Sequence, residues 1–299
     1  MRKVKYAGIQ MRCVKNAAEN IKTADRLVRE AASKGAQIIL LPELFENRYF
    51  CQERNYDSYL LAKPVEENDA VIHFRKLAKE LKVVLPISFY ERDVNVFYNS
   101  VAVIDADGSV LGIYRKTHIP DDHFYQEKFY FTPGDTGFKV WNTRYARIGV
   151  GICWDQWFPE CARGMAVQGA ELLLYPTAIG SEPILECDSM PHWRRCMQGH
   201  AACNIIPVIA ANRFGEEKVE PSEANGGQSS SLIFYGSSFV TDETGEVLVQ
   251  ASRDREEIVY GESDLDRVQT HRNSWGLYRD RRPEMYEEIL TSDGKAHRE

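Results

Sequence analysis

Cys153 is the residue whose position most clearly suggests chemistry, because it stands where an apolar stretch gives way to a predicted helix. The surrounding sequence, residues 149–160, is GVGICWDQWFPE. The N-terminus of a helix presents unpaired N–H groups and partial positive charge, which favour a thiolate and can bind the oxygen of a tetrahedral intermediate. The sequence therefore predicts a cysteine nucleophile at this strand end.

A cysteine nucleophile needs a base and an electrostatic partner, and two other predicted strands end in ionisable residues. Glu43 follows the short apolar run at 38–42, and Lys116 follows a predicted strand that begins near residue 110. In layered α/β proteins, strand ends are where reactive groups from distant parts of the chain converge. We therefore expect Glu43, Lys116 and Cys153 to meet in one site.

These sequence contexts resemble those of the carbon–nitrogen hydrolase (nitrilase) superfamily, whose Glu-Lys-Cys triad they match as Glu43, Lys116 and Cys153. The resemblance runs from residue 4 to about residue 286. It includes the segment EKFYFTPG, in which Glu127 matches the family's auxiliary active-site carboxylate. Each motif alone is weak, since a buried Cys or a strand-end Glu is usually structural. Together, in this order and at family-like spacing, they are specific.

The resemblance also implies the fold class and the domain organisation. It implies an α/β protein with a single domain, a four-layer α-β-β-α sandwich over residues 1–290, followed by a disordered or loosely ordered tail at 291–299. It further implies a homo-oligomer with a dimer as its building block. Aromatic and arginine residues at 273–283 make the segment 264–290 a candidate subunit contact.

Alternating strand and helix patterns agree with this fold class. Helices are predicted from Asn16, which begins a capping box with Glu19, to Gly35, and then over 69–81, 159–168 and 192–204. Strands are predicted over 4–10, 38–41, 83–90, 100–105, 110–114, 148–153, 172–175, 208–211 and within 232–263. The segment 215–231, rich in Gly and Ser, is predicted to be a long surface loop.

The composition limits the classes of partner and compartment. The 299 residues carry a net charge of −7, which argues against nucleic acid as a partner and favours a cationic substrate. The sequence shows no signal-peptide pattern and no apolar stretch long enough to span a bilayer, so we expect a cytoplasmic protein without a membrane partner. Seven cysteines without a C-x-x-C pair argue against a zinc finger and a disulfide framework, and they predict a free thiol at Cys153.

Hydrolysis of an amide or carbamoyl group needs a strong nucleophile, oxyanion stabilisation and a proton for the leaving amine. The resemblance assigns attack to Cys153, general base and acid catalysis to Glu43, and oxyanion binding to Lys116 with the backbone N–H of Trp154. Glu127 is expected to orient Lys116 and Glu43. This chemistry requires no metal or organic cofactor, and the histidines lack the spacing of zinc ligands.

The residues after the nucleophile help to select the substrate. Relatives that act on carbamoyl amino acids place Arg or His there, whereas this chain has Trp154, Asp155 and Gln156, which argues against a carboxylate-bearing substrate. Glu182, on the loop after the strand at 172–175, is a candidate partner for a distant ammonium. Together with the family resemblance, which implies a ureido group, these residues predict a small cationic ureido substrate. The candidate contacts for it are Tyr49, Tyr125, Trp154, Glu182, Thr177 and His123.

Other interpretations share some of these features. A β-ureidopropionase or an ω-amidase would use the same triad on a different substrate. A glutaminase-like module that supplies ammonia needs an attached synthetase domain, for which we expect no room after residue 290. A non-catalytic scaffold of this fold usually lacks a triad member, whereas this chain has all three.

Overall fold

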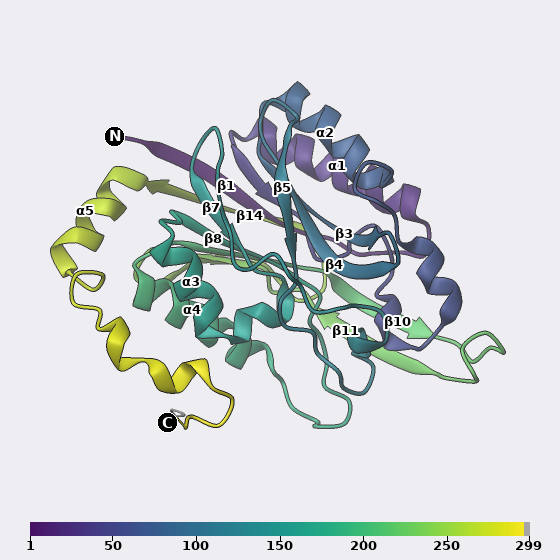
Figure 1. Ribbon diagram of the computed structural model, residues 1–299. Coiled ribbons are helices and arrows are strands. Elements are labelled where there is room, and N and C mark those ends of the chain that lie inside the picture. Colours follow the sequence, from purple (N-terminus) through teal and green to yellow (C-terminus); the bar gives the residue numbers. More distant parts are fainter. Residues whose placement is uncertain (296–299) are drawn as a thin grey trace.

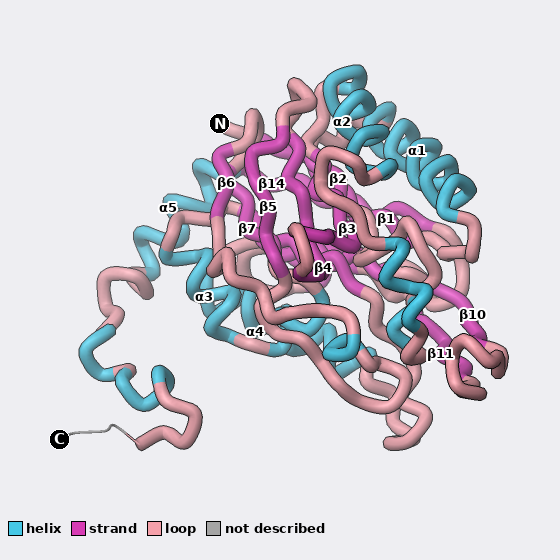
Figure 2. The backbone as a smooth tube through the Cα atoms, turned by 45° about the vertical axis from the view of Figure 1, so that its right-hand side comes forward, coloured by secondary structure: helices cyan, strands magenta, loops and turns pink. Residues whose placement is uncertain are grey.

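Two β-sheets packed face to face form the centre of the protein, and helices cover the outer face of each sheet (Figure 1). The computed structural model describes residues 1–295. Helices α1 (Ala17–Ser33) and α2 (Asp69–Leu81) pack on one sheet, and α3 (Pro159–Val167) and α4 (Met190–Asn204) pack on the other. Figure 2 shows the strands between these two helix pairs. The predicted α-β-β-α sandwich is thus confirmed.

The first sheet joins two groups of three strands, with the orders β14-β1-β2 and β3-β4-β5. The backbone N–H of Ile39 donates to Val84 O at 3.0 Å, and that of Val84 donates to Gln37 O at 2.8 Å, so the two groups form one layer. The strands are β1 (Lys3–Gln10), β2 (Ile38–Leu40), β3 (Leu85–Asp93), β4 (Val96–Ile104), β5 (Val110–Arg115) and β14 (Glu257–Asp264).

The second sheet has the strand order β13-β12-β9-β8-β7-β6. Its central strands β7, β8 and β9 are parallel, so their carboxyl ends lie at one edge, from which β7 leads to Cys153. The strands are β6 (Val140–Asn142), β7 (Arg147–Val150), β8 (Leu172–Thr177), β9 (Val208–Asn212), β12 (Phe239–Thr241) and β13 (Val247–Gln250).

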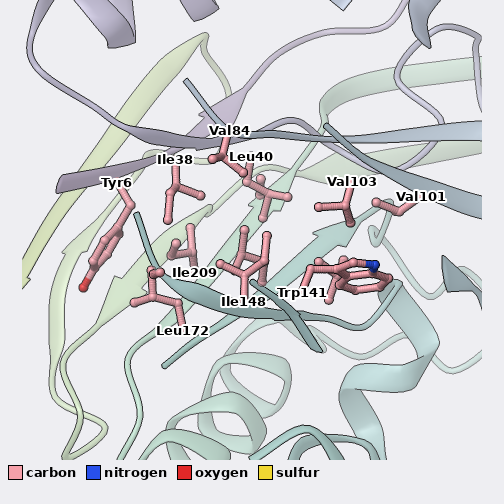
Figure 3. Close-up of a cluster of buried hydrophobic side chains, with 14 of the residues drawn as sticks. Tyr6, Ile38, Leu40, Val84, Val101, Val103, Trp141, Ile148, Leu172 and Ile209 are labelled. Carbon is pink, nitrogen blue, oxygen red and sulfur yellow. The ribbon is translucent and has the colours of Figure 1, made fainter. Parts of the chain in front are cut away.

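Alternation of side chains along each strand divides the core into layers. On β8, Leu172 lies between the two sheets, whereas Leu173 packs with residues of α3 and α4. Figure 3 shows the layer between the sheets, where Ile38 of β2 and Ile148 of β7 project toward each other from opposite sheets. Because both faces of these strands are covered, they read as nearly continuous apolar runs in the sequence.

Local signals predicted helices α1 to α4 well but missed α5 (Leu265–Trp275). Helix α2 has the predicted bounds, and α1 begins after Asn16, whose side chain accepts hydrogen bonds from the backbone N–H groups of Ala18 at 3.0 Å and Glu19 at 3.4 Å. These bonds satisfy donors that have no partner inside the helix.

The prediction of a loop over 215–231 is wrong at both ends, where the chain forms strands. The strands β10 (Phe214–Val219) and β11 (Ser230–Tyr235) pair as an antiparallel hairpin, which leaves a loop at 220–229. Glu217 and Val219 are buried while Lys218 between them is exposed, so the strand alternates as a half-buried strand should. Because the buried residue Glu217 is charged, a search for alternating apolar residues does not detect this strand.

The chain ends in helix α5 (Leu265–Trp275) and a segment that extends away from the sandwich in both views (Figures 1 and 2). Residues 292–295 of the predicted tail are exposed, Thr291 is partly buried, and residues 296–299 lie outside the described part. No helix within residues 1–295 has the length and apolar character that a bilayer crossing demands.

Replacing Leu172 by Ala tests the layer between the sheets. Leu172 is fully buried, so Leu172→Ala should lower the free energy of unfolding by about 2–5 kcal/mol, because apolar burial is lost and a cavity remains. Leu248 is 51% exposed, and the same change there should cost less than about 1 kcal/mol. Urea unfolding at one protein concentration measures both. Equal losses would contradict this assignment of the core.

Candidate active site

The candidate catalytic residues lie where strand ends of the two sheets meet. Glu43 comes shortly after β2, Lys116 directly after β5 and Cys153 shortly after β7. Glu127 begins the 3-10 helix Glu127–Phe129. All four side chains are buried, so they form a site inside the protein that is reached through a pocket.

Lys116 occupies the centre of this cluster. Its Nζ donates to Glu43 Oε1 at 2.9 Å and to Glu127 Oε2 at 2.6 Å, and its side chain has no exposed surface. Burial alone would disfavour the ammonium, but the charges of Glu127 and Glu43 outweigh it and raise the pKa of Lys116 well above its ordinary value. Lys116 is therefore a permanent cation that can stabilise negative charge and cannot act as a base.

The two carboxylate oxygens of Glu43 have different surroundings. Oε1 accepts hydrogen bonds from Lys116 and from Asn99 Nδ2, the latter at 2.6 Å. Oε2 is buried and has no hydrogen-bond partner within residues 1–295. A buried acceptor without a hydrogen-bond partner is costly in free energy. We therefore interpret Oε2 as the atom of Glu43 that accepts a proton during the reaction. Asn99, on β4, was not anticipated from the sequence.

Glu127 is held from two sides. Tyr49 Oη donates to Glu127 Oε1 at 2.7 Å, while Lys116 donates to Oε2. Burial raises the pKa of Glu127 to about 7, with repulsion from Glu43 adding to the rise and attraction to Lys116 opposing it. The charge balance around Lys116 is therefore sensitive to this carboxyl group.

Cys153 sits in a strained backbone conformation. Its φ of +43° lies in the left-handed region, which a residue with a Cβ rarely adopts, and its Sγ donates to Ala178 O at 3.8 Å. Burial and the charge of Glu43 raise the pKa of the thiol well above its ordinary value, against the opposing effect of Lys116. At neutral pH Cys153 is a thiol that needs a base.

The expectation that a helix N-terminus activates Cys153 is wrong. The chain after it forms the 3-10 helix Cys153–Trp157, and the α-helix α3 starts only at Pro159. So short a turn has little dipole of its own, and burial controls the protonation of the thiol.

Asp155 fixes the turn that carries the nucleophile. Its Oδ2 accepts hydrogen bonds from the backbone N–H of Ile152 at 3.0 Å and from Tyr114 Oη at 2.7 Å. Its Oδ1 accepts from the backbone N–H of His118 at 3.0 Å and lies 2.8 Å from His118 Nδ1. One fully buried carboxylate thus connects the segment after Lys116 to the turn of Cys153.

A cavity of about 480 Å³ opens onto Cys153. It receives three of the predicted substrate contacts, Tyr125, Trp154 and Glu182, together with Glu127. Glu182 is half-buried, and burial followed by the charge of Asp122 raises its pKa. The lining residues are Pro120, Asp121, Asp122, Tyr125, Glu127, Cys153, Trp154, Trp157, Ala178, Ile179, Glu182, Leu185, Cys187, Ser189 and His192.

Three predicted substrate contacts lie elsewhere. Tyr49 is buried behind the lining and holds Glu127, and Thr177 is buried with its Oγ1 donating to Gln156 Oε1 at 2.9 Å. His123 is exposed and lines a neighbouring depression of about 420 Å³. An aromatic or polar residue near a strand end can face the core, the pocket or solvent, and packing decides between them.

The lining contains residues that sequence reasoning missed. Trp157 lines the pocket and lies at the end of the 3-10 helix that starts at Cys153. Its closeness to the nucleophile in sequence was the signal that could have identified it. Asp121 and Asp122 were considered as part of a polar loop, and they line the pocket beside Glu182. Residues 1–295 contain no group of three or more His, Cys, Asp or Glu side chains placed to hold a metal ion.

Comparisons with known proteins agree with this geometry. The sequence matches the family model of carbon–nitrogen hydrolases over residues 5–273. It is 54% identical to an N-carbamoylputrescine amidase of rice, Oryza sativa, over 98% of this chain and 96% of the relative, and 52% identical to a citrullinase of Francisella tularensis over 97% and 99%. The crystal structure of a carbon–nitrogen hydrolase from Helicobacter pylori superposes with a TM-score of 0.88 at 38% identity, covering 97% of this chain and 99% of that one. The protein therefore belongs to the carbon–nitrogen hydrolase family.

Proposed function

We propose that this protein hydrolyses N-carbamoylputrescine to putrescine, CO2 and NH3, a step in polyamine synthesis from agmatine. The observation that carries the proposal is the charge of the pocket. Asp121, Asp122 and Glu182 line it, and among the described residues its lining includes no Lys or Arg. N-carbamoylputrescine has a neutral ureido group, four methylenes and a terminal ammonium. Its ureido carbon would lie at Cys153 and its ammonium near the acidic residues.

Three segments of the sequence support the same substrate. Residues 127–131 (EKFYF), 153–160 (CWDQWFPE) and 175–180 (YPTAIG) resemble the corresponding segments of N-carbamoylputrescine amidohydrolases. They contribute Glu127, the nucleophile turn and the pocket residues Ala178 and Ile179. The likeness therefore falls on segments that contribute residues to the pocket lining.

The first half of the reaction forms a covalent intermediate. Glu43 Oε2 takes the proton of the Cys153 thiol as Sγ attacks the ureido carbon, and the carbonyl oxygen becomes an oxyanion. The Lys116 ammonium and the backbone N–H of Trp154 stabilise this oxyanion. When the intermediate collapses, the proton on Glu43 passes to the leaving nitrogen, and a thiocarbamate ester of Cys153 remains.

The second half releases the enzyme. Glu43 removes a proton from water, which attacks the thiocarbamate carbon, and the proton returns to Sγ as the C–S bond breaks. The released carbamic acid decomposes to CO2 and the second amine. Because Lys116 remains charged throughout, the same cation stabilises the oxyanion of both steps.

The rim of the pocket favours a cation and disfavours a carboxylate. Glu182 and Asp122 repel each other, and the substrate ammonium would relieve this repulsion. Tyr125 and Trp154 would contact the methylene chain. Citrulline has the same ureido group but carries a carboxylate beside its ammonium, and N-carbamoyl-β-alanine has only a carboxylate at that end. Both would place negative charge near Asp121, Asp122 and Glu182, which is costly.

We further propose that the protein forms a homo-oligomer built from dimers, with 264–290 in the contact. Tyr278 Oη anchors the middle of this segment to Asn204 O at 2.8 Å. Beyond it, Ile289 is 62% and Leu290 is 83% exposed, on a segment that extends from the body (Figure 2). Exposed apolar side chains on such an extension suit a contact with a second copy.

We place the reaction in the cytoplasm, and the state of the cysteines supports this proposal. All seven cysteines are free thiols. Reducing compartments keep cysteines unpaired, whereas secreted proteins pair them.

Substrate preference tests the proposed function. We expect kcat/KM for N-carbamoylputrescine to exceed that for citrulline and for N-carbamoyl-β-alanine by at least about 100-fold. Glu182→Gln should lower kcat/KM for N-carbamoylputrescine by at least about tenfold, since a hydrogen bond to a charged group contributes about 1.5–3 kcal/mol. Steady-state ammonia release measures all of these. A neutral butylurea is the control, and its rate should hardly change in the variant. A preference for citrulline would overturn the assignment.

Removing the nucleophile tests the mechanism. Cys153→Ala should fold normally yet lower kcat by more than about 10⁴-fold, because no thioester-type intermediate can form. Mass spectrometry of quenched reactions should find the adduct on the wild-type protein and none on the variant. Cys161→Ala is the matched control, since Cys161 is equally buried, in α3, and outside the pocket lining. Turnover by Cys153→Ala would disprove the mechanism.

A charge placed on the C-terminal segment tests the assembly. Leu290→Glu should reduce the average mass measured by light scattering, because a charge at a subunit contact is costly to bury. Val94 is 81% exposed on the turn after β3, and Val94→Glu should leave the mass unchanged. A wild-type protein with the mass of a single chain would refute the proposal.

A further inference from the structure

A buried ion pair lies behind the active site, outside the pocket lining. Arg213 connects β9 to β10, and Glu217 lies on β10. Arg213 Nη1 is 3.0 Å from Glu217 Oε1, and the two side chains are 0% and 3% exposed. An ion pair removed from water pays a large desolvation penalty, so it is weak evidence for stability. Its contacts show what else it does.

All the remaining side-chain hydrogen bonds of the pair go to one short segment, residues 43–49. Arg213 Nη2 donates to Glu43 O at 2.7 Å and to Leu44 O at 3.0 Å, and Nη1 donates to Asn47 O at 3.1 Å. Glu217 Oε2 accepts from the backbone N–H of Tyr49 at 2.7 Å. The pair thus binds both the start and the end of this segment.

The segment 43–49 belongs to no α-helix or strand, so its backbone groups need partners from elsewhere. Leu44 has a φ of +46°, a conformation that is costly for a residue with a Cβ and persists only where the surroundings impose it. The rigid guanidinium of Arg213 offers several donors in one plane, which matches the carbonyls of such a bend.

The two ends of the segment carry the side chains that fix the two carboxylates around Lys116. Glu43 contacts Lys116 directly, and Tyr49 holds Glu127, the second carboxylate on Lys116. A shift of the segment would therefore move both carboxylates relative to Lys116 and Cys153.

We propose that Arg213 and Glu217 are positioning residues for catalysis, which hold the segment 43–49 so that Glu43 and Glu127 keep their places around Lys116. The inference rests on the proposed hydrolase chemistry but not on the identity of the ureido substrate. Neither residue touches the substrate, so their effect falls on the rate of the chemical steps and not on substrate binding.

Arg213→Lys is the first test, with Arg272→Lys as the matched control. Arg272 is also a buried arginine that donates to backbone carbonyls, at 2.9 Å to Ile205 O, but it lies in α5 away from the pocket. Arg213→Lys should lower kcat per folded protein by at least about tenfold, because a displacement near 1 Å of a catalytic group can cost about 100-fold. KM should stay within about threefold of wild type. Arg272→Lys should keep both constants after correction for the folded fraction.

Glu217→Gln is the second test and keeps the size of the side chain. One terminal oxygen of the side chain becomes an NH2 group that faces either Arg213 or the N–H of Tyr49, so one hydrogen bond is lost. As for Arg213→Lys, kcat should fall while KM is retained. Circular dichroism gives the folded fraction of each variant. Unchanged kcat in both variants would overturn the proposal. So would a loss of folding in both while Arg272→Lys folds, because the pair would then serve stability alone.

Alkylation of Cys153 separates this inference from the proposed function. Iodoacetamide forms an S–C bond to Sγ with loss of iodide, and Glu43 accepts the thiol proton. Peptide mapping should show slower alkylation of Cys153 in Arg213→Lys than in wild type or Arg272→Lys. This readout holds even for a protein that hydrolyses none of the ureido compounds, and equal alkylation rates in the three proteins would count against the positioning role.

Discussion

The enclosure of the Lys116 ammonium between two carboxylates is the interaction on which the rest of the site depends. A buried charge is tolerated only when it is paired and its partners are satisfied in turn. Glu43 and Glu127 pair with it, Asn99 donates to the first carboxylate and Tyr49 to the second. Two buried acceptors of this network, Oε2 of Glu43 and Oδ1 of Asn99, have no hydrogen-bond partner within residues 1–295, and only the carboxylate oxygen is basic enough to take a proton. The network therefore directs proton transfer to one atom.

This requirement explains why the site draws on so many distant parts of the chain. The triad lies at strand ends of both sheets, where side chains from separate segments meet. Much of the connecting backbone there lies outside α-helices and strands, so buried side chains such as Asp155 and Arg213 supply part of its hydrogen bonds. A packed four-layer sandwich provides the dry surroundings in which such bonds are strong.

The residues at the pocket rim select the substrate, whereas those at the centre carry out the reaction. Relatives with almost equal identity act on different ureido compounds, as the rice amidase and the Francisella citrullinase illustrate. Overall identity therefore does not separate the substrates. The side chains at the rim can, because a substrate ammonium and a substrate carboxylate respond oppositely to Asp121, Asp122 and Glu182.

The sequence by itself, through its local patterns and its resemblance to a known family, determined which residues assemble and on what kind of fold. Apolar runs, caps and residue order are local properties, so the helix at 69–81 and the strand ends carrying Glu43, Lys116 and Cys153 could be read from it. Only the tertiary structure decided which way the neighbouring side chains face: Tyr49 toward Glu127, Thr177 into the core and His123 to solvent. It also decided that Glu217 is a buried strand residue and that burial, not a helix dipole, sets the pKa of Cys153. Burial and orientation depend on contacts between segments far apart in the chain, and no local pattern encodes them.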